Sequence, residues 1–358
     1  MMWRRPAGET TRGAQARCMI VLVVGIALLT ACKPQAPASQ VDTAPAQAPV
    51  QAPAAAQAVA AYVPNQKSGT ISVIDTATDR VVRTLSGGDG LGKRLQQIAL
   101  TPDRKQLYVV DAERHRLLLL DIASDTVQRS VDIGQGAEGV GVSPDGRQLV
   151  VCIEGQNQVM FIDAATFALG AHVDVQGKAP EHCVWTPDGK SVLTSNEASD
   201  TIDVIDVASG KSVASIATSG HPRGIVFAEG GAKAYVAQES ADVVDVIDLG
   251  ARKRIGSIPA ALRTAGVAIS PDGTRVYASN GGAHSVTAID VASGKVLAEI
   301  PVGERPWNPA VTPDGAKVYV ANGRSNSVSV IDTATLRKIA DIPVGEMPWG
   351  VIIPSWRG

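Results

Sequence analysis

The chain has 358 residues, 45% of them hydrophobic, and its 33 Lys and Arg nearly balance its 35 Asp and Glu, for a formal net charge of −2. Such a charge excludes attraction of nucleic acid through a global positive field, so an anionic partner would need a local basic patch. The apolar run near the N-terminus, Met19 to Leu29, is too short for a membrane-spanning helix, which needs about 18 residues or more.

The first 31 residues predict a secretory signal, because a basic segment with four Arg precedes the apolar run and small residues follow it. The run ends in Leu29-Thr30-Ala31-Cys32, which resembles a bacterial lipobox. In such signals the Cys becomes the first residue of the mature chain and carries acyl groups, so the resemblance implies lipidation of Cys32. Lys33 follows rather than an Asp, which implies transfer to the outer membrane of a Gram-negative cell. We expect a lipid anchor at its periplasmic face, with a short uncleaved membrane anchor as the alternative.

Residues 32–58 are nearly all Ala, Pro, Gln, Val, Ser and Thr. Such a segment cannot bury enough apolar surface to offset its chain entropy, and its prolines favour extended conformations. We expect a flexible tether. The predicted signal has four Arg and one Glu, so its removal would change the net charge from −2 to about −5.

The remainder, residues 59–358, contains a repeat. Seven Asp recur at steps of 46, 42, 43, 42, 42 and 42 residues, each after a short aliphatic run, at Asp75, Asp121, Asp163, Asp206, Asp248, Asp290 and Asp332. A period near 42 with four strand-like runs per unit is typical of a propeller blade. The sequence therefore predicts an all-β fold, a seven-bladed β-propeller of four-stranded antiparallel blades.

The clearest copy lies between Arg305 and Gly345. Its four expected strands are 306–311, 317–321, 327–331 and 338–342. Thr312-Pro313-Asp314-Gly315 joins the first two, since Pro fixes φ, Asp can bond the backbone ahead and Gly accepts φ > 0. The recurring Asp lies at the other hairpin. Seven equivalent copies indicate a turn cap rather than a catalytic carboxylate.

The chain begins out of phase with the repeat. Ala60–Asn65 matches a second strand, and the last match, Pro348–Ile353, is to a first strand. We therefore expect the C-terminal strand to become the innermost strand of the blade that begins at the N-terminus. This closure leaves no open sheet edge between the first and last blades.

Tyr319-Val320-Ala321-Asn322, the run from Ser327 to Asp332 and Ile-Pro-Val-Gly at 342–345 resemble the YVTN-type propeller repeat. The resemblance covers residues 59–358 and, with export and seven units, is similar to YncE-like periplasmic proteins. It implies a periplasmic binding protein; the family includes a single-stranded DNA binder and many members without an assigned activity. Some blades depart from the pattern, as at Ile153 and at 93–97. Function does not follow from fold alone.

The segments before each first strand and after each second strand are expected on one face, around the channel mouth. These residues differ between blades, and variation on a rigid scaffold is typical of binding sites. The candidate ligand-binding residues are Arg94, Glu138, Glu181, His182, His221, Arg223, Arg263, Arg305, Trp307 and Trp349. The last three arginines and the two tryptophans are expected to form a basic and aromatic arc, with the glutamates opposite. A channel plug of tryptophans and solvated loop arginines are the alternative interpretations.

The leading interpretation is a monomeric, non-enzymatic binding or scaffold protein attached to the membrane by its lipid anchor. Its ligand is left open between a small molecule, a peptide, an envelope protein and an extended anion such as single-stranded nucleic acid. An enzyme or accessory of a periplasmic oxidation or lactonase-type reaction is the alternative, and convergent groups with perturbed pKa values would favour it.

No haem-attachment, zinc-protease or nucleophile-elbow motif occurs in the sequence, so we predict no cofactor, metal or catalytic residue. A weaker possibility is a metal held by Glu181, His182 and His221. Cys152 and Cys183 are expected in strands of neighbouring blades. Because packed sheets lie about 10 Å apart and a disulfide needs Cα atoms within about 7 Å, we predict two buried free thiols.

Overall fold

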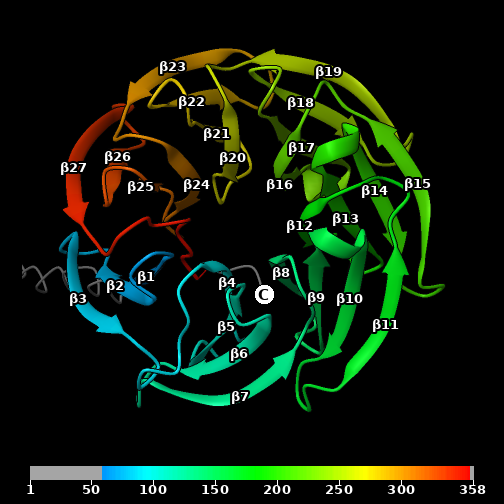
Figure 1. Cartoon of the computed structure of the whole chain (residues 1–358). Helices are drawn as coiled ribbons and strands as arrows, with labels where there is room; N and C mark the ends of the chain where they lie inside the picture. Colours follow the sequence, from blue (N-terminus) through cyan, green and yellow to red (C-terminus); the bar gives the residue numbers. More distant parts are fainter. Residues whose placement is uncertain (1–58, 355–358) are drawn as a thin grey trace, which may run out of the picture. The chain divides into compact units, whose positions relative to one another are not determined.

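The four-run unit of the sequence folds into one antiparallel sheet, and seven such sheets form a ring (Figure 1). This computed structural model describes residues 59–354. The predicted signal, tether and lipidated Cys32 lie outside the described residues. Within 59–354, no helix is long and apolar enough to cross a membrane.

The blades are numbered in chain order. Blade 1 contains β1 Ala60–Asn65, β2 Thr70–Asp75 and β3 Arg80–Leu85, and blade 2 contains β4 Leu95–Leu100, β5 Gln106–Asp111, β6 Arg116–Asp121 and β7 Thr126–Asp132. Blade 3 contains β8 Ala137–Val142, β9 Gln148–Ile153, β10 Gln158–Asp163 and β11 Leu169–Asp174. Blade 4 contains β12 Pro180–Trp185, β13 Ser191–Asn196, β14 Thr201–Asp206 and β15 Lys211–Ala217. Blade 5 contains β16 Pro222–Ala228, β17 Lys233–Gln238, β18 Val243–Asp248 and β19 Lys253–Pro259. Blade 6 contains β20 Thr264–Ile269, β21 Arg275–Asn280, β22 Ser285–Asp290 and β23 Val296–Pro301. Blade 7 contains β24 Pro306–Val311, β25 Lys317–Asn322, β26 Ser327–Asp332 and β27 Arg337–Pro343. Three short 3₁₀ turns, Glu154–Gln156, Glu197–Ser199 and Glu229–Gly231, interrupt this pattern among the described residues.

The hydrophobic core lies between neighbouring blades. The middle strands are buried on both faces, as in β26, while the outermost strands, such as β27, are mostly exposed. One cluster joins Tyr277 of blade 6 to Val318 of blade 7, and both side chains are fully buried. Because every blade packs on both sides, its middle strands read as nearly continuous apolar runs instead of the alternation of a half-exposed sheet.

The seven periodic Asp are turn caps, as predicted. In every hairpin that leads into an outermost strand, the Asp side chain accepts a backbone N–H two or three residues ahead. Asp332 is typical: its Oδ1 accepts both the N–H and the hydroxyl of Thr335 at 2.7 Å. The recurrence of this residue is therefore explained by turn geometry.

The ring closes at blade 1, which confirms the predicted exchange of strands between the chain ends. Tyr62 and Ile352 exchange backbone hydrogen bonds of 2.8 and 2.9 Å, and the Trp349 N–H donates to the Pro64 carbonyl at 3.0 Å. The same closing segment also touches blade 7, where the Val351 N–H donates to the Asn308 carbonyl at 3.1 Å. This segment therefore supplies the missing inner strand of blade 1.

Cys152 on β9 and Cys183 on β12 are both free and buried, as expected. They belong to one hydrophobic cluster between blades 3 and 4. The Cys183 Sγ lies 3.6 and 3.7 Å from the carbonyl oxygens of Gly139 and Val150. Burial raises the pKa of the Cys152 thiol well above its usual value. The two side chains therefore act as packing elements of this blade interface.

Candidate functional site

The channel mouth is built by the same backbone turn in all seven blades. The residue that precedes each inner strand has a left-handed backbone, with φ from 53° to 80°, at Arg94, Gly136, Ala179, His221, Arg263, Arg305 and Met347. In every blade its carbonyl accepts the N–H of the residue after the second strand; the Glu239 N–H donates to the His221 carbonyl at 2.9 Å. Non-glycine residues adopt this conformation at a cost of about 1 kcal/mol or more, so these bonds hold it in place. The turn therefore sets His221 beside Glu239.

Arg223, on β16, lies at the centre of an ion-pair network and is only 8% exposed. Its Nη2 is 2.5 Å from Glu181 Oε1, and its Nη1 is 2.6 Å from Glu197 Oε1 and 2.8 Å from Glu239 Oε2. One guanidinium thus joins carboxylates from blades 4 and 5. Its Nε is buried without a hydrogen-bond partner.

Two further arginines converge on Glu239. The Nε and Nη2 of Arg263 lie 2.8 and 2.5 Å from Glu239 Oε1, and the Nη2 of Arg305 lies 3.2 Å from the same oxygen. Burial alone would raise the pKa of Glu239, but the three surrounding arginines lower it. Glu239 is therefore a fixed negative charge.

Glu181 and Glu138 differ from Glu239 in their protonation. Burial raises the pKa of Glu181 well above its usual value, with Arg223 opposing the shift. Burial and the nearby Glu154 raise the pKa of Glu138 to about 7. The Glu138 Oε1 accepts a hydrogen bond of 2.9 Å from Gln96 Nε2 and lies 3.7 Å from Arg94. Around neutral pH, Glu138 can both donate and accept a proton.

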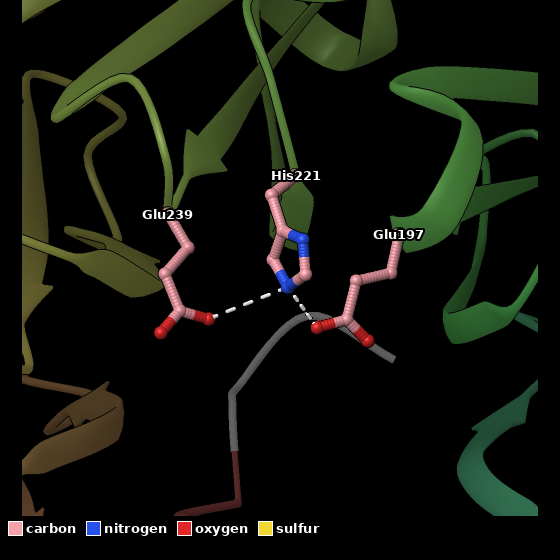
Figure 2. Close-up of side chains that lie close together, drawn as sticks. All are labelled: Glu197, His221 and Glu239. Carbon is pink, nitrogen blue, oxygen red and sulfur yellow. Dashed lines mark ion pairs between the residues drawn. The ribbon is translucent and has the colours of Figure 1, made fainter.

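Glu197, His221 and Glu239 form a second grouping on this face (Figure 2). Their carboxylates turn toward His221 Nε2, which contacts Glu197 Oε1 and lies 3.7 Å from Glu239 Oε2. The spacing of these atoms would suit metal ligands. However, Arg223 Nη1 donates to the same two oxygens. A guanidinium thus supplies the positive charge that a metal would, and we assign charge pairing here.

The two tryptophans have different surroundings. Two guanidiniums lie over the Trp307 ring, that of Arg305 at 4.5 Å and that of Arg223 at 5.1 Å from its centroid. Trp349, in the closing segment, is 5% exposed, and its centroid is 5.6 Å from that of His182. Trp307 therefore belongs to the charged mouth, while Trp349 lines the channel beneath it.

A cavity of about 140 Å³ lies on the channel axis below this mouth. Inner strands from six of the seven blades line it, through Gln97, His182, Ile225, Val267, Asn308 and Trp349 among others. The lining combines polar side chains, those of Gln97, His182 and Asn308, with apolar ones such as Ile98, Ile225 and Val267. The channel therefore offers charge at its mouth and apolar surface at its floor.

The structure brings most of the predicted mouth residues together. Six of them share the network around Arg223, namely Glu181, His221, Arg223, Arg263, Arg305 and Trp307. Arg94 and Glu138 form a neighbouring pair, while His182 and Trp349 lie below the mouth. The expected acidic and basic sides meet directly, since Glu181 contacts Arg223. From the sequence we considered Glu181, His182 and His221 as metal ligands. The group whose atoms lie close enough together among the described residues is instead Glu197, His221 and Glu239.

Sequence reasoning missed Glu197 and Glu239. They occupy the position directly after the second strand, where the other blades have Gln66, Ala112, Glu154, Gly281 and Gly323. The residue one position earlier, the last of the second strand, is Asn322 in blade 7. That side chain is fully buried, and its amide donates to Ser327 and Ser329 at 3.1 and 2.9 Å. The last residue of the second strand thus has a structural role. The variation between blades at the residue directly after it is the sequence signal that could have identified Glu197 and Glu239.

The sequence matches the family described as lactonase, 7-bladed beta-propeller, over residues 120–218 and 211–348. The chain belongs to this family. Among solved structures, Kuenenia stuttgartiensis hydrazine synthase is 24% identical with a TM-score of 0.69, over 76% of this chain and 92% of that one. A functionally unknown protein from Desulfotomaculum acetoxidans is 14% identical with a TM-score of 0.72, over 83% and 99%. At these identities the likeness shows the fold alone. No curated protein matches the chain.

Proposed function

We propose that the channel mouth binds a small molecule that carries a carboxylate or a similar anion. The observation that carries this proposal is the convergence of Arg263 and Arg305 on a single oxygen of Glu239. The Arg263 side chain remains 52% exposed, so part of its planar donor set faces the mouth. Guanidinium groups with remaining donors bind carboxylates in a bidentate manner.

The charge of the cluster supports the same ligand class. Three arginines face the carboxylates of Glu197 and Glu239, while Glu138 and Glu181 have raised pKa values and contribute less negative charge. The cluster therefore keeps positive charge near neutral pH. Trp307, stacked against Arg305, adds an apolar wall beside it.

The arginine pairing favours a small ligand over an extended one. Arg223 is almost fully buried, and Arg305 is 14% exposed, so they do not form an open basic arc. An extended anion such as single-stranded nucleic acid needs a row of accessible cations and stacking platforms. A compact anion can instead be held by the few donors that face the mouth.

Isothermal titration with acetate, gluconate and benzoate tests this proposal, at low and physiological salt. We expect saturable binding that Arg305→Ala and Arg263→Ala weaken about tenfold. Arg337→Ala, on the exposed strand β27, is the matched control and should bind like wild type. Equal binding by all three variants would contradict the proposal. Tight, strongly salt-dependent binding of a single-stranded oligonucleotide would replace it with the extended-anion alternative.

A lactonase-type reaction is the second candidate, favoured by the protonation of Glu138 and by the family to which the chain belongs. A carboxylate with a pKa of about 7 can take a proton from a water molecule while the oxygen of that water bonds to the carbonyl carbon of a lactone. The same proton can then pass to the ring oxygen as the ring C–O bond breaks, giving a hydroxy acid. Guanidiniums beside it would stabilise the oxyanion.

A pH-stat assay with γ- and δ-lactones tests this second candidate. Hydrolysis above the spontaneous rate should rise with pH through about 7, and Glu138→Gln should lower it at least about tenfold. Glu346→Gln, at an exposed position, serves as the control. Rates indistinguishable from the spontaneous reaction would reject the lactonase candidate and leave binding as the only proposed function.

We further propose that the propeller acts in the periplasm. Acylated Cys32 would anchor it to the outer membrane, and the tether of residues 32–58 would hold it away from the bilayer. This rests on the signal and lipobox residues of the sequence. Cys32→Ala should abolish labelling by a fatty-acid probe and yield soluble or uncleaved protein. Persistent labelling of the variant would rule out this site.

A further inference from the structure

The cavity below the mouth can accommodate an apolar part of the ligand, which the arginines cannot bind. Its floor is apolar, formed by Ile98, Ile225 and Val267. Its volume of about 140 Å³ resembles the roughly 150 Å³ apolar cavities that hold a benzene ring. A single ring is therefore the largest rigid group that it accommodates.

Three polar side chains line the cavity above this floor: Gln97, His182 and Asn308. His182 is 5% exposed, and among the described residues its ring nitrogens make no hydrogen bond. The nearest ionisable contact of its Nε2 is Glu181 Oε1, at 3.8 Å. The Oε1 of Gln97 is buried without a hydrogen-bond partner. Buried polar groups are nearly always satisfied, so the Gln97 oxygen marks a place for a polar atom of a ligand or of water, and the His182 ring lies beside it in the cavity lining.

The same surroundings exclude charge. Burial lowers the pKa of His182 to about 3, with Arg223 adding to the shift, so the imidazole is neutral and offers one donor and one acceptor. Any ionised group in this cavity would suffer the same desolvation. The Trp349 ring, 5.6 Å from that of His182, leaves no room for another ring between them, so the two form one wall.

We infer that the ligand is a small monoanion with one uncharged ring, its anionic group at Arg263 and Arg305 and its ring in the channel cavity against Trp349 and His182. The ring class includes aromatic rings and lactones with a hydrogen-bonding substituent. This inference deepens the proposed function and rests on it for the anionic group. The cavity itself makes a separate claim, which an uncharged ring compound can test.

Three probes separate the two claims: phenol has only the ring, acetate only the carboxylate, and benzoate both. We expect Trp fluorescence and isothermal titration to show saturable binding of phenol, and benzoate to bind at least about tenfold more tightly than acetate. Val184→Phe should fill the cavity and abolish the advantage of the ring. Val226→Phe, at the equivalent position of the next blade and outside the cavity lining, is the matched control.

His182→Leu provides a second variant that keeps an apolar wall and removes the hydrogen bonds. It should weaken phenol about fivefold or more, with melting temperatures confirming that each variant is folded. If acetate and benzoate bind equally and phenol does not bind, the ring site is wrong while the anion site stands. If phenol binds but Arg305→Ala leaves benzoate unchanged, the cavity stands and the proposed function fails. Absence of binding by all three probes overturns both.

Discussion

The Nη2 of Arg223 lies 2.5 Å from Glu181 Oε1, and 42 residues separate them in the sequence, the step that relates blade 4 to blade 5. The two residues occupy the same position of successive blades. The repeat therefore places a carboxyl group against a guanidinium across a blade boundary, deep in the mouth. Repetition of the backbone allows such a contact only where neighbouring copies have diverged in charge.

Loss of this cation should destabilise the propeller. Arg223→Gln leaves three carboxylates without their shared partner, and removal of one member of a buried ion pair costs about 3–5 kcal/mol. Denaturant unfolding should show this loss, whereas Arg263→Gln, with a half-exposed side chain, should cost less than about 1 kcal/mol. Equal losses in the two variants would contradict the central role of Arg223.

The same variant tests the charge-pairing assignment for Glu197, His221 and Glu239. In wild type, Arg223 competes for the oxygens that a metal would need, so millimolar Mn²⁺ or Zn²⁺ should not raise the melting temperature. In Arg223→Gln these ligands are released, and either ion should raise the melting temperature by binding to the native state. Stabilisation of wild type by either ion would show instead that the site binds metal in the presence of the arginine.

Stability should depend on pH through Glu138. Its folded pKa of about 7 exceeds the ordinary value of 4.5, so the unfolded state releases its proton first and stability falls as pH rises from about 4.5 to 7. Glu138→Gln should therefore match wild type near pH 4 and exceed it at pH 8, by roughly 1–3 kcal/mol. Urea titrations at pH 4, 6 and 8 measure the difference. A pH-independent difference would show that burial does not perturb this carboxyl.

The closing segment should be a point of vulnerability. Ile352→Pro removes the N–H that donates to the Tyr62 carbonyl and leaves that acceptor unsatisfied, at a cost of about 1–3 kcal/mol. Ile339→Pro is the matched control, because it lies at the bulge of an exposed outer strand, where proline is tolerated. Thermal unfolding should separate the two variants. Similar melting temperatures would mean that the seam contributes little to stability.

The two cysteines should remain reduced even under oxidising conditions. Both are buried in the interface of blades 3 and 4. A maleimide added in denaturant without reductant should label Cys152 and Cys183, and neither should react in the native protein. A product without label on these residues would indicate a disulfide.

The periodic features were predictable from sequence, because each copy repeats the local chemistry of one turn or strand. The turn caps at Asp332 and its equivalents, and the strand exchange that pairs Tyr62 with Ile352, follow from the spacing alone. The mouth positions were predictable as a ring, but not their partners. That Arg223 reaches Glu197 and Glu239 depends on side-chain rotamers and on the spacing of neighbouring blades at the mouth, and the sequence of the repeat reveals neither.

The left-handed turn at the mouth separates folding from chemistry. In each blade the turn is held by the carbonyl of its central residue, and residues as different as Arg305, Ala179 and Met347 occupy the same conformation. The side chain at that position can consequently differ between blades while the turn is kept, because the hydrogen bond offsets the cost of a left-handed backbone. Substitutions at these seven turns can therefore change the binding specificity of the mouth one blade at a time, while the propeller fold beneath stays the same.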